Sequence, residues 1–374
     1  MKRADGNPIT MLLVAGGTGG HILPAIAFGD WLREAHPDVN VAFMSGSRSI
    51  ELEIYRAFEI EPYTVGVSGS PLGVPGVRMI KRWAELFFGF FQAVRFLKKM
   101  SPDICVLFGG YVSMPALLAG KLSGLRSVIH EQNARAGRVT RAAAMMNIPV
   151  AAGWSDCEPL KDGSYANVGV PVRRFEKMNR KEAWEALGVE DEKTGGPTVA
   201  VMTGSLGSGK LAEALLELTK MELFSSWRFF VVDPSADSVR KASVNVTLLP
   251  RMWDITPLYV VSDLLVTRGG ASTLSEVRAL DMPAVVAPWR GALDDHQMKN
   301  ARAASCSKIL IWNEDESSLT DLADKLQKLY AIFGDKNSNI GNMLYNASMY
   351  GEKICRRLMD FAVGSRKGEV DFGG

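Results

Sequence analysis

Short apolar runs alternate with segments of helical length along almost the whole chain. In the first half these runs are ITMLLVAG (9–16), VNVAFMSG (39–46), DICVLFGG (103–110) and RSVIHEQ (126–132). In the second half they are TVAVMTGS (198–205), WRFFVVD (227–233), DLLVTRGG (263–270) and PAVVAPW (283–289). Strands that are apolar throughout are typical of parallel sheets covered by helices on both faces. The pattern therefore predicts an α/β chain with two doubly wound, Rossmann-like halves.

The alternation breaks once, between residues 171 and 197, where a proline, a charged helical stretch and the polar run DEKTGGP interrupt it. A chain of 374 residues is also longer than one ordinary domain. We therefore expect an N-terminal domain over residues 1–172 and a C-terminal domain over residues 173–348. Residues 349–374 should form a helix that returns to the N-terminal domain, followed by a tail.

Composition excludes several classes of protein. Apolar residues make up 47% of the chain and charged residues 22%, so neither disorder nor a fibrous architecture is expected. A formal net charge of +2 argues against a dedicated nucleic-acid binder. The four cysteines are too far apart for a C-x-x-C motif, which favours reduced thiols in the cytosol. No apolar run is long enough to cross a bilayer.

The most informative motif is a glycine-rich turn, Gly16-Gly17-Thr18-Gly19-Gly20-His21, between the first strand and the helical stretch 23–35. Its glycines allow a ligand to approach the backbone, and the N–H groups at the start of a helix suit a phosphate. The dinucleotide fingerprint G-x-G-x-x-G does not fit, because Thr18 and Ile22 stand where it requires glycine. A purely structural turn is the alternative. His21 favours a functional turn, since histidine acts as a base or donor near neutral pH, although a lone histidine is structural by default.

Three further turns join a strand to a helix. Residues 204–210 (GSLGSGK) resemble a phosphate-binding NTPase loop, but Leu211 stands where magnesium needs Ser or Thr, which argues against an ATPase. Residues 267–273 (TRGGAST) lead into a helix with Glu276, which suits either a ribose diol or a simple acidic helix start. Residues 109–115 (GGYVSMP) form the turn in the first half. Four such turns at the carboxyl ends of strands predict one ligand-binding crevice.

Seven motifs occur in a fixed order between about residues 10 and 360. They are GGTGGHILPA (16–25), GGYVSMP (109–115), HEQN (130–133), GVPVR (169–173), TGSLGS (203–208), RGGASTLSE (268–276) and DDHQMKNA (294–301). Together they resemble the motifs of the MurG family, UDP-N-acetylglucosamine transferases of peptidoglycan synthesis. The resemblance implies the GT-B fold, in which two Rossmann-like domains face a central crevice.

The resemblance also implies an inverting glycosyltransferase. Such an enzyme moves N-acetylglucosamine from UDP-GlcNAc to the 4-hydroxyl of the muramyl sugar of undecaprenyl-pyrophosphoryl-MurNAc-pentapeptide (lipid I), giving lipid II. UDP is a stabilised leaving group, so neither a metal nor another cofactor is expected, and Asp294-Asp295 is interpreted as a turn. Other cell-wall synthesis proteins are further candidate partners. A UDP-sugar 2-epimerase of the same fold and a non-catalytic nucleotide-sugar-binding scaffold remain as alternatives.

The motifs assign expected roles residue by residue. His21 is the expected general base, and binding of a diphosphate is its alternative role. Glu131 is the alternative base, or the residue that orients His21. Acceptor contacts are expected from Gly17, Tyr111 and Ser113. Donor contacts are expected from Thr18, Gly19, Gly20, Asn133, Arg173, Ser205, Met252, Gly270, Ala271, Ser272, Thr273, Glu276, His296 and Gln297.

Residues 74–100 combine many cations with a cluster of aromatic side chains. Six basic residues accompany one acid, Glu85, which suits a helix that lies on an anionic lipid surface. The alternative is a helix buried against the sheet, and we expect one packed face and one membrane-facing side. The enzyme should then be peripheral, on the cytoplasmic face of the plasma (inner) membrane. The expected membrane contacts are Arg78, Lys81, Arg82, Trp83, Phe87, Phe88 and Phe91.

Overall fold

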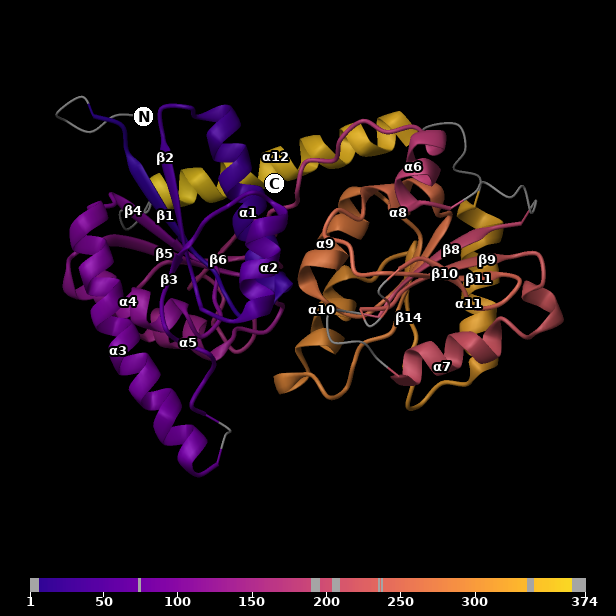
Figure 1. Ribbon diagram of the computed structural model, residues 1–374, viewed down its shortest axis with the longest axis horizontal. Coiled ribbons are helices and arrows are strands. Elements are labelled where there is room, and N and C mark those ends of the chain that lie inside the picture. The colour runs from indigo at the N-terminus through magenta and orange to yellow at the C-terminus, as the bar shows by residue number, and fades with distance from the viewer. Residues whose placement is uncertain are drawn as a thin grey trace. The chain divides into compact units, whose positions relative to one another are not determined.

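The chain forms two compact units, each an α/β structure built on one sheet (Figure 1). The computed structural model describes residues 7–72, 75–189, 196–203, 209–234, 236, 238–334 and 340–364. The first unit comprises Met1–Arg174 and Gly351–Gly374, and the second comprises Phe175–Tyr350. The chain therefore divides after residues 174 and 350, whereas the sequence predicts boundaries after residues 172 and 348.

The first unit contains a seven-stranded parallel sheet in the order β3-β2-β1-β4-β5-β6-β7. The strand order changes direction between β1 and β4, which pair from Met11 and Ile104 to Val14 and Leu107. The turns that follow these two strands therefore share one edge, where doubly wound sheets bind ligands. The elements are β1 (Thr10–Val14), α1 (Gly19–Ala35), β2 (Asn40–Ser45), α2 (Ser49–Ala57), β3 (Tyr63–Thr64), α3 (Val77–Met100), β4 (Ile104–Leu107), α4 (Ser113–Leu122), β5 (Arg126–Glu131), α5 (Arg138–Met145), β6 (Val150–Ala152) and β7 (Ala166–Asn167).

The second unit repeats this architecture, with the sheet order β10-β11-β9-β8-β12-β13-β14. All pairs are parallel except β10 with β11. Its switch point lies between β8 and β12. The elements are α6 (Arg180–Leu187), β8 (Thr198–Met202), α7 (Gly209–Leu218), η1 (Glu222–Phe224), β9 (Arg228–Val232), β10 (Arg240–Lys241), β11 (Val246–Leu249), α8 (Thr256–Val261), β12 (Leu264–Thr267), α9 (Ala271–Ala279), β13 (Ala284–Val286), η2 (Leu293–Asp295), α10 (His296–Ala304), β14 (Ile309–Ile311), α11 (Leu319–Phe333) and α12 (Ile340–Gly364).

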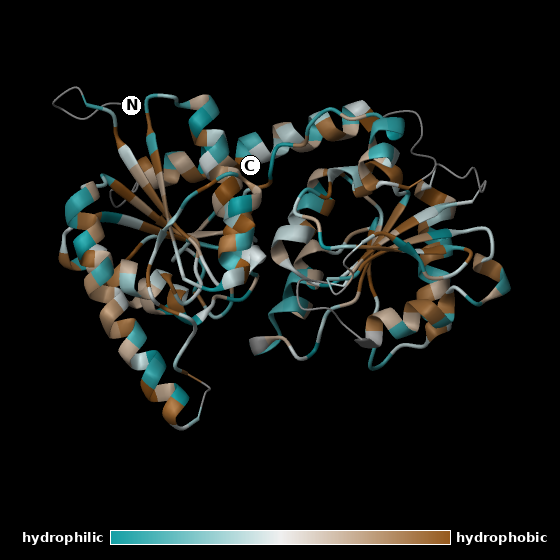
Figure 2. Cartoon of the chain, viewed as in Figure 1, coloured by the Kyte–Doolittle hydropathy of each residue, from teal (hydrophilic) through white to brown (hydrophobic). Residues whose placement is uncertain are grey.

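The central strands of each sheet are apolar and buried, as the continuous apolar runs predict. Every residue of β1 and of β8 is buried, and the strands are the most hydrophobic part of each unit in Figure 2. In the first unit, Leu12 and Leu107 of the sheet share a core with Phe96 of α3. In the second unit, Val201 and Phe229 form part of the corresponding core. The prediction of two doubly wound α/β halves is confirmed.

Several elements differ from the expected pattern. α1 begins at Gly19 rather than near residue 23, because Thr18 already has the extended backbone of a helix N-cap. The strands β3, β6, β7, β10, β11 and β14 match no predicted strand. All six lie outside the two central pairs of strands that flank the switch points. α12 begins at Ile340 rather than near residue 350, and its residues from Gly351 onward belong to the first unit.

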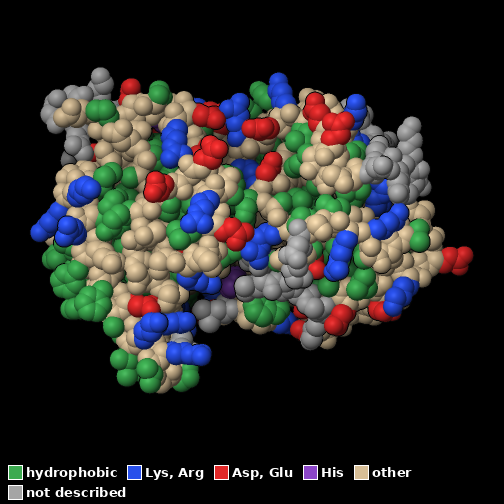
Figure 3. All heavy atoms as spheres, in the orientation of Figure 1, with side chains coloured by type: hydrophobic (Ala, Val, Ile, Leu, Met, Phe, Trp, Pro, Cys, Tyr) green, Lys and Arg blue, Asp and Glu red, His purple; other side chains and the backbone are tan. Residues whose placement is uncertain are grey.

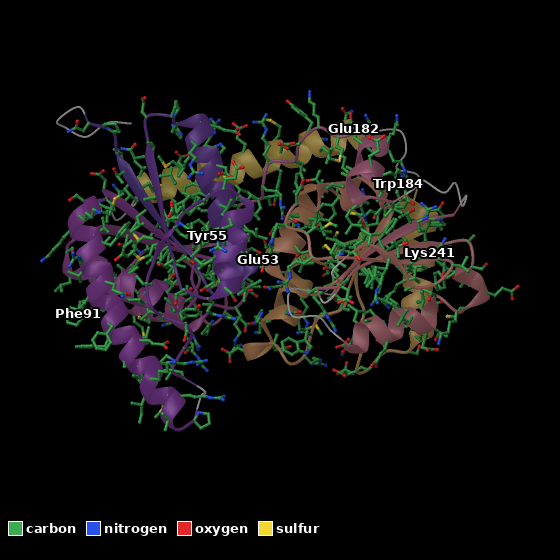
Figure 4. The ribbon with its side chains drawn as sticks, in the orientation of Figure 1. Glu53, Tyr55, Phe91, Glu182, Trp184 and Lys241 are labelled. Carbon is green, nitrogen blue, oxygen red and sulfur yellow. The ribbon has the colours of Figure 1, made fainter. Side chains whose placement is uncertain are left out.

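α3 has one packed face and one exposed face. Gly89, Ala93 and Leu97 are buried on the packed face. Trp83 and Phe88 on the other face are 53% and 63% exposed. In Figure 4 the labelled Phe91 points away from the sheet, and in Figure 1 the first turns of α3 project beyond the strands of this unit. No helix among the described residues is both long and apolar enough to span a membrane.

Candidate active site

A buried carboxylate organises the glycine-rich turn after β1. Glu51 of α2 is fully buried, and its Oε1 accepts hydrogen bonds from the N–H of Gly17 and from the hydroxyl of Tyr111, the latter at 2.7 Å. Its Oε2 accepts from the N–H of Arg48 at 2.9 Å. Burial and the bond to Glu51 raise the pKa of Tyr111, so its hydroxyl remains protonated and donates. Glu51 therefore links the turns after β1 and β4.

The two turns approach each other closely enough to require glycine. Gly110 has a φ of +75°, and a Cβ there would lie 2.3 Å from the carbonyl oxygen of Gly16. Ser113, the first residue of α4, is fully buried, and its hydroxyl donates to the carbonyl oxygen of Gly109 at 2.6 Å. The side chain of Ser113 thus closes the turn. The acceptor contact expected of Ser113 stays a prediction, and its hydroxyl already donates within the turn.

The helices that follow the glycine-rich turns begin without side-chain caps. The N-caps Thr18 of α1 and Gly270 of α9 form no side-chain capping bond, and neither helix has an acid in its first turn. By contrast, Asn179 and Ser318 cap α6 and α11. Uncapped helix starts leave N–H groups and a positive dipole end that suit an anion. Side-chain caps are likewise absent at α3, α4, α5, α8 and α10, so a missing cap alone does not distinguish α1 and α9, each of which also follows a glycine-rich turn. The starts of both helices suit an anion.

His21 lies in the first turn of α1 and is held by the HEQN motif. Its Nδ1 lies 2.7 Å from Oε1 of Gln132. Nε2 of Gln132 lies 2.9 Å from Nδ1 of His130 and donates to the carbonyl oxygen of His130 at 3.0 Å. Nε2 of His130 lies 2.8 Å from the carbonyl oxygen of Gly169. The residue beside His21 is therefore Gln132, and the expectation that Glu131 orients His21 is wrong.

Glu131 is directed into its own loop instead. Its side chain is buried, and Oε1 accepts from the backbone N–H of Asn133 at 3.0 Å and from the side-chain amide of Asn133 at 3.1 Å. Oε2 accepts from the N–H of Gly137 at 2.8 Å and from the hydroxyl of Thr140 at 2.5 Å. A carboxylate with four hydrogen bonds of this kind is well suited to hold the loop and the start of α5.

In the second unit, α10 holds the turn after β12. Oε1 of Gln297 accepts from the N–H groups of Gly269 and Trp289 at 3.1 and 3.0 Å. The side-chain amide of the buried Asn300 donates to the carbonyl oxygen of Gly269 at 3.0 Å. Oε1 of Gln297 is therefore engaged by the turn, and its NH₂ group is the donor end of the side chain. Asp294 and Asp295, both with positive φ, form the turn before α10.

Glu276 is also fixed by a neighbour. It is buried in α9, beyond the first turn, and its Oε2 accepts from the hydroxyl of Tyr259 at 2.8 Å. The turn between β12 and α9 is held at Arg268. Its NH1 lies 2.9 Å from Oε2 of Glu314 and donates to the carbonyl oxygen of Ala287 at 2.9 Å. Glu276 therefore has a defined orientation, unlike a solvated acid at a helix start.

The expected donor residues are divided between the units. Residues 18–20, Asn133 and Arg173 belong to the first unit, and the others belong to the second. Thr18 is exposed, Asn133 and Arg173 are half-buried, and so are Met252, Ser272, Thr273 and His296. Ser205 lies outside the described residues. Within the described ranges, no group of three or more His, Cys, Asp and Glu residues is arranged to hold a metal ion.

Comparison with known proteins decides the family. The family models described as Glycosyltransferase family 28 N-terminal domain and C-terminal domain match residues 11–147 and 198–339. A relative from Chlorobaculum parvum is named UDP-N-acetylglucosamine--N-acetylmuramyl-(pentapeptide) pyrophosphoryl-undecaprenol N-acetylglucosamine transferase. It is 32% identical over 349 residues, which cover 87% of this chain and 90% of the relative. The chain belongs to the MurG family.

Solved structures agree with the MurG fold. The crystal structure of MurG from Acinetobacter baumannii matches with a TM-score of 0.64 and 24% identity, covering 96% of this chain and 100% of that one. UDP-GlcNAc 2-epimerase from Neisseria meningitidis, bound to UDP-GlcNAc, matches with a TM-score of 0.58 and 14% identity, covering 94% and 100%. At these identities the likeness concerns the fold alone. The expected two-domain GT-B fold is confirmed.

Two residues that organise the candidate site, Gln132 and Glu51, are not marked by any pattern in the sequence. Gln132 stands inside the HEQN motif, but an amide does not titrate, and its contact with His21 spans 111 positions. Glu51 lies in the helical segment ELEIYRAF, where an acid is normally a solvent-exposed residue. Glu51 acquires its role in the site through its contact with Tyr111, which lies on a different strand-to-helix turn. The sequence does not show that these two residues meet.

Proposed function

We propose that this chain transfers N-acetylglucosamine from UDP-GlcNAc to the 4-hydroxyl of the muramyl sugar of undecaprenyl-pyrophosphoryl-MurNAc-pentapeptide, with inversion at the anomeric carbon. The observation that carries the proposal is 32% identity, over most of both chains, to a transferase named for this reaction. The glycine-rich turns and the uncapped helix starts of both units support it, because the two substrates are both diphosphates.

The diphosphate of the donor is assigned to the start of α9. Gly270, Ala271, Ser272 and Thr273 offer backbone N–H groups and two hydroxyls there, with no acid in the first turn to repel an anion. Stabilising the charge that develops on UDP lowers the barrier without protonating the leaving group. Arg173 and Ser205 are further proposed donor contacts. We assign the uracil to the segment at Met252.

The sugars of the donor are assigned to polar side chains with defined orientations. Glu276, fixed by the Tyr259 hydroxyl, would accept hydrogen bonds from the ribose diol. Gln297, whose Oε1 is already occupied, would donate through its NH₂ group to sugar hydroxyls beside His296. Asn133 and Thr18-Gly19-Gly20 complete the proposed donor set from the first unit.

His21 is the proposed general base. It removes the proton of the acceptor 4-hydroxyl as the oxygen attacks the anomeric carbon, while the bond from that carbon to the β-phosphate oxygen breaks and its electron pair leaves with UDP. Glu131 is not a base in this scheme, because both of its oxygens already accept two hydrogen bonds from the loop. Gly17 and Tyr111 are the proposed contacts of the acceptor diphosphate.

Product analysis tests this function directly. The purified chain, incubated with UDP-GlcNAc and a soluble lipid I analogue, is expected to release UDP and disaccharide in equal amounts. Formation of the 2-epimer of UDP-GlcNAc without the acceptor would instead support the epimerase. Nucleotide-sugar binding without any product would support a scaffold. Either of these two results contradicts the proposal.

The exposed face of α3 is the proposed membrane contact, on the cytoplasmic face of the plasma membrane. Figure 3 shows Lys and Arg side chains gathered with hydrophobic ones over the first turns of this helix. Arg78 and Lys81 are exposed there, beside the exposed Trp83. Arg82 is partly engaged, since it donates to the carbonyl oxygen of Ser70 at 2.7 Å. Phe87, Phe88 and Phe91 extend the apolar part of the face.

We expect the double variant Arg78→Gln, Lys81→Gln to bind anionic vesicles about 30-fold more weakly than the wild type, because each cation near such a surface contributes about 1 kcal/mol. Vesicle flotation with and without anionic phospholipid measures the effect. The control is Lys181→Gln, Lys241→Gln, which removes two exposed cations from the second unit. Equal loss in both variants, or equal flotation of the wild type with neutral lipid, would contradict the electrostatic contact.

A further inference from the structure

A continuous series of hydrogen bonds runs from His21 through the HEQN motif to the backbone at Gly169, entirely within the first unit. Hydrogen positions in such a series are inferred from which partners can only donate or only accept. Here two members are backbone carbonyl oxygens, which only accept. They fix the proton positions of every group between them.

The first of these carbonyl oxygens, that of His130, determines the orientation of the Gln132 side-chain amide. The carbonyl oxygen of His130 lies 3.0 Å from Nε2 of Gln132, so the NH₂ group must face it. Oε1 of Gln132 then faces His21, 2.7 Å from Nδ1. Because Oε1 can only accept, Nδ1 of His21 must carry the proton. In a neutral imidazole the lone pair then resides on Nε2.

The second carbonyl oxygen, that of Gly169, determines the tautomer of the buried His130. The carbonyl oxygen of Gly169 lies 2.8 Å from Nε2 of His130, so that nitrogen carries the proton. Burial lowers the pKa of His130 to about 4, so the ring is neutral near pH 7. Its Nδ1 is therefore an acceptor, and the NH₂ group of Gln132 at 2.9 Å is its donor. The assignments from the two ends agree.

The amide has little freedom to rotate. Gln132 is 1% exposed, and both ends of its side-chain amide have the partners described above. Nε1 of Trp154 donates separately to the backbone carbonyl oxygen of Gln132, at 2.8 Å. Flipping the amide would place its oxygen against the His130 carbonyl and would leave buried polar groups without partners, at about 1–3 kcal/mol each. One orientation is therefore strongly preferred.

We propose that Gln132 and His130 are positioning residues that hold His21 in the tautomer protonated at Nδ1, so that Nε2 takes the acceptor proton. This role rests on the transfer reaction proposed above. When Nε2 accepts the proton of the 4-hydroxyl, His21 becomes an imidazolium whose Nδ1 still donates to Gln132. The amide oxygen stabilises that cation, and no proton moves along the series. Nε2 of His21 makes no hydrogen bond to any residue that the structure describes.

The tautomers can be measured without turnover. The chain has only four histidines, so long-range ¹H–¹⁵N spectra of the ¹⁵N-histidine-labelled protein can be assigned by single substitutions. We expect His21 to be protonated at Nδ1 and His130 at Nε2. Observation of His21 protonated at Nε2 in the wild type would overturn the proposal, whatever any variant does.

Gln132→Met removes the amide while keeping an unbranched side chain of similar length. We expect His21 to populate both tautomers and kcat to fall about 10- to 100-fold with little change in KM for UDP-GlcNAc. This is less than the about 10⁴-fold loss that a wrong tautomer causes in a serine protease triad, because the free ring can still exchange tautomers. An unchanged tautomer with unchanged kcat would contradict the role of Gln132.

Trp154→Phe is the matched control. It removes the bond to the backbone of the same residue but leaves the side-chain amide in place. We expect lower stability, an unchanged His21 tautomer and an unchanged kcat. Failure of the wild type to form disaccharide, with both tautomers as expected, would reject the transfer reaction and keep the hydrogen-bond assignment. Disaccharide formation with the opposite His21 tautomer would reject the positioning role alone.

Discussion

His21→Ala should lower kcat by about 10²- to 10⁴-fold, the usual contribution of a positioned general base, and should leave UDP-GlcNAc binding intact. The donor can still bind because the proposed diphosphate and ribose contacts of α9 lie in the second unit, to which His21 does not belong. Single-turnover kinetics with a lipid I analogue measure the loss, and calorimetric titration with UDP-GlcNAc measures donor affinity.

His21→Asn separates the loss of the general base from the loss of the hydrogen bond between His21 and Gln132. The alanine variant leaves Oε1 of the buried Gln132 without its donor, whereas the amide NH₂ of asparagine can replace the Nδ1–H of the imidazole. We expect the asparagine variant to recover stability but not kcat. His36→Ala, at the other end of α1, is the control and should retain full turnover. Near-normal kcat with a raised acceptor KM in either His21 variant would assign the residue to diphosphate binding instead.

The sequence predicts the frame of the site because that frame depends on local patterns. Glycine runs between an apolar strand and a helix specify strand-to-helix turns, and parallel strands bring their carboxyl ends to one edge. The turn after β1 and the turn after β4 were placed correctly in this way, although nearly a hundred positions separate them. The two faces of α3 are also predicted from a local pattern, because cations and aromatic side chains are combined within one helical segment.

The detailed orientation of side chains depends on contacts that no local pattern contains. A carboxylate beside a candidate base suggests an orienting partner, so Glu131 is a reasonable expectation from HEQN alone. In the fold, however, Glu131 and Gln132 are adjacent residues at the end of β5 that face different directions. Glu131 meets the start of α5, and Gln132 meets α1. Which of the two reaches His21 depends on how the loop after β5 turns, and the motif does not specify that.

Gly110→Ala should have the second large effect, because two penalties coincide at this residue. Its φ of +75° is unfavourable for an L side chain, and a Cβ would lie 2.3 Å from the backbone oxygen of Gly16. Since that oxygen belongs to the backbone, the turns after β1 and β4 must move apart. We expect unfolding free energy to fall by about 3 kcal/mol or more. We also expect kcat to fall about 10²-fold, since a shift of about 1 Å at a catalytic group can cost that much.

Gly124→Ala measures the penalty of a positive φ by itself, without a steric clash. Gly124 has a φ of +66°, close to that of Gly110, but a Cβ there would meet no atom within 4 Å. Backbone strain alone should cost about 1–2 kcal/mol. Turnover should remain normal because Gly124 lies past the C-terminal end of α4, whereas the turn with Gly110 precedes its N-terminal end. Urea denaturation and single-turnover rates of both variants provide the comparison. If the two alanines destabilise the protein equally and Gly110→Ala keeps its kcat, the close approach of the two turns does not support catalysis.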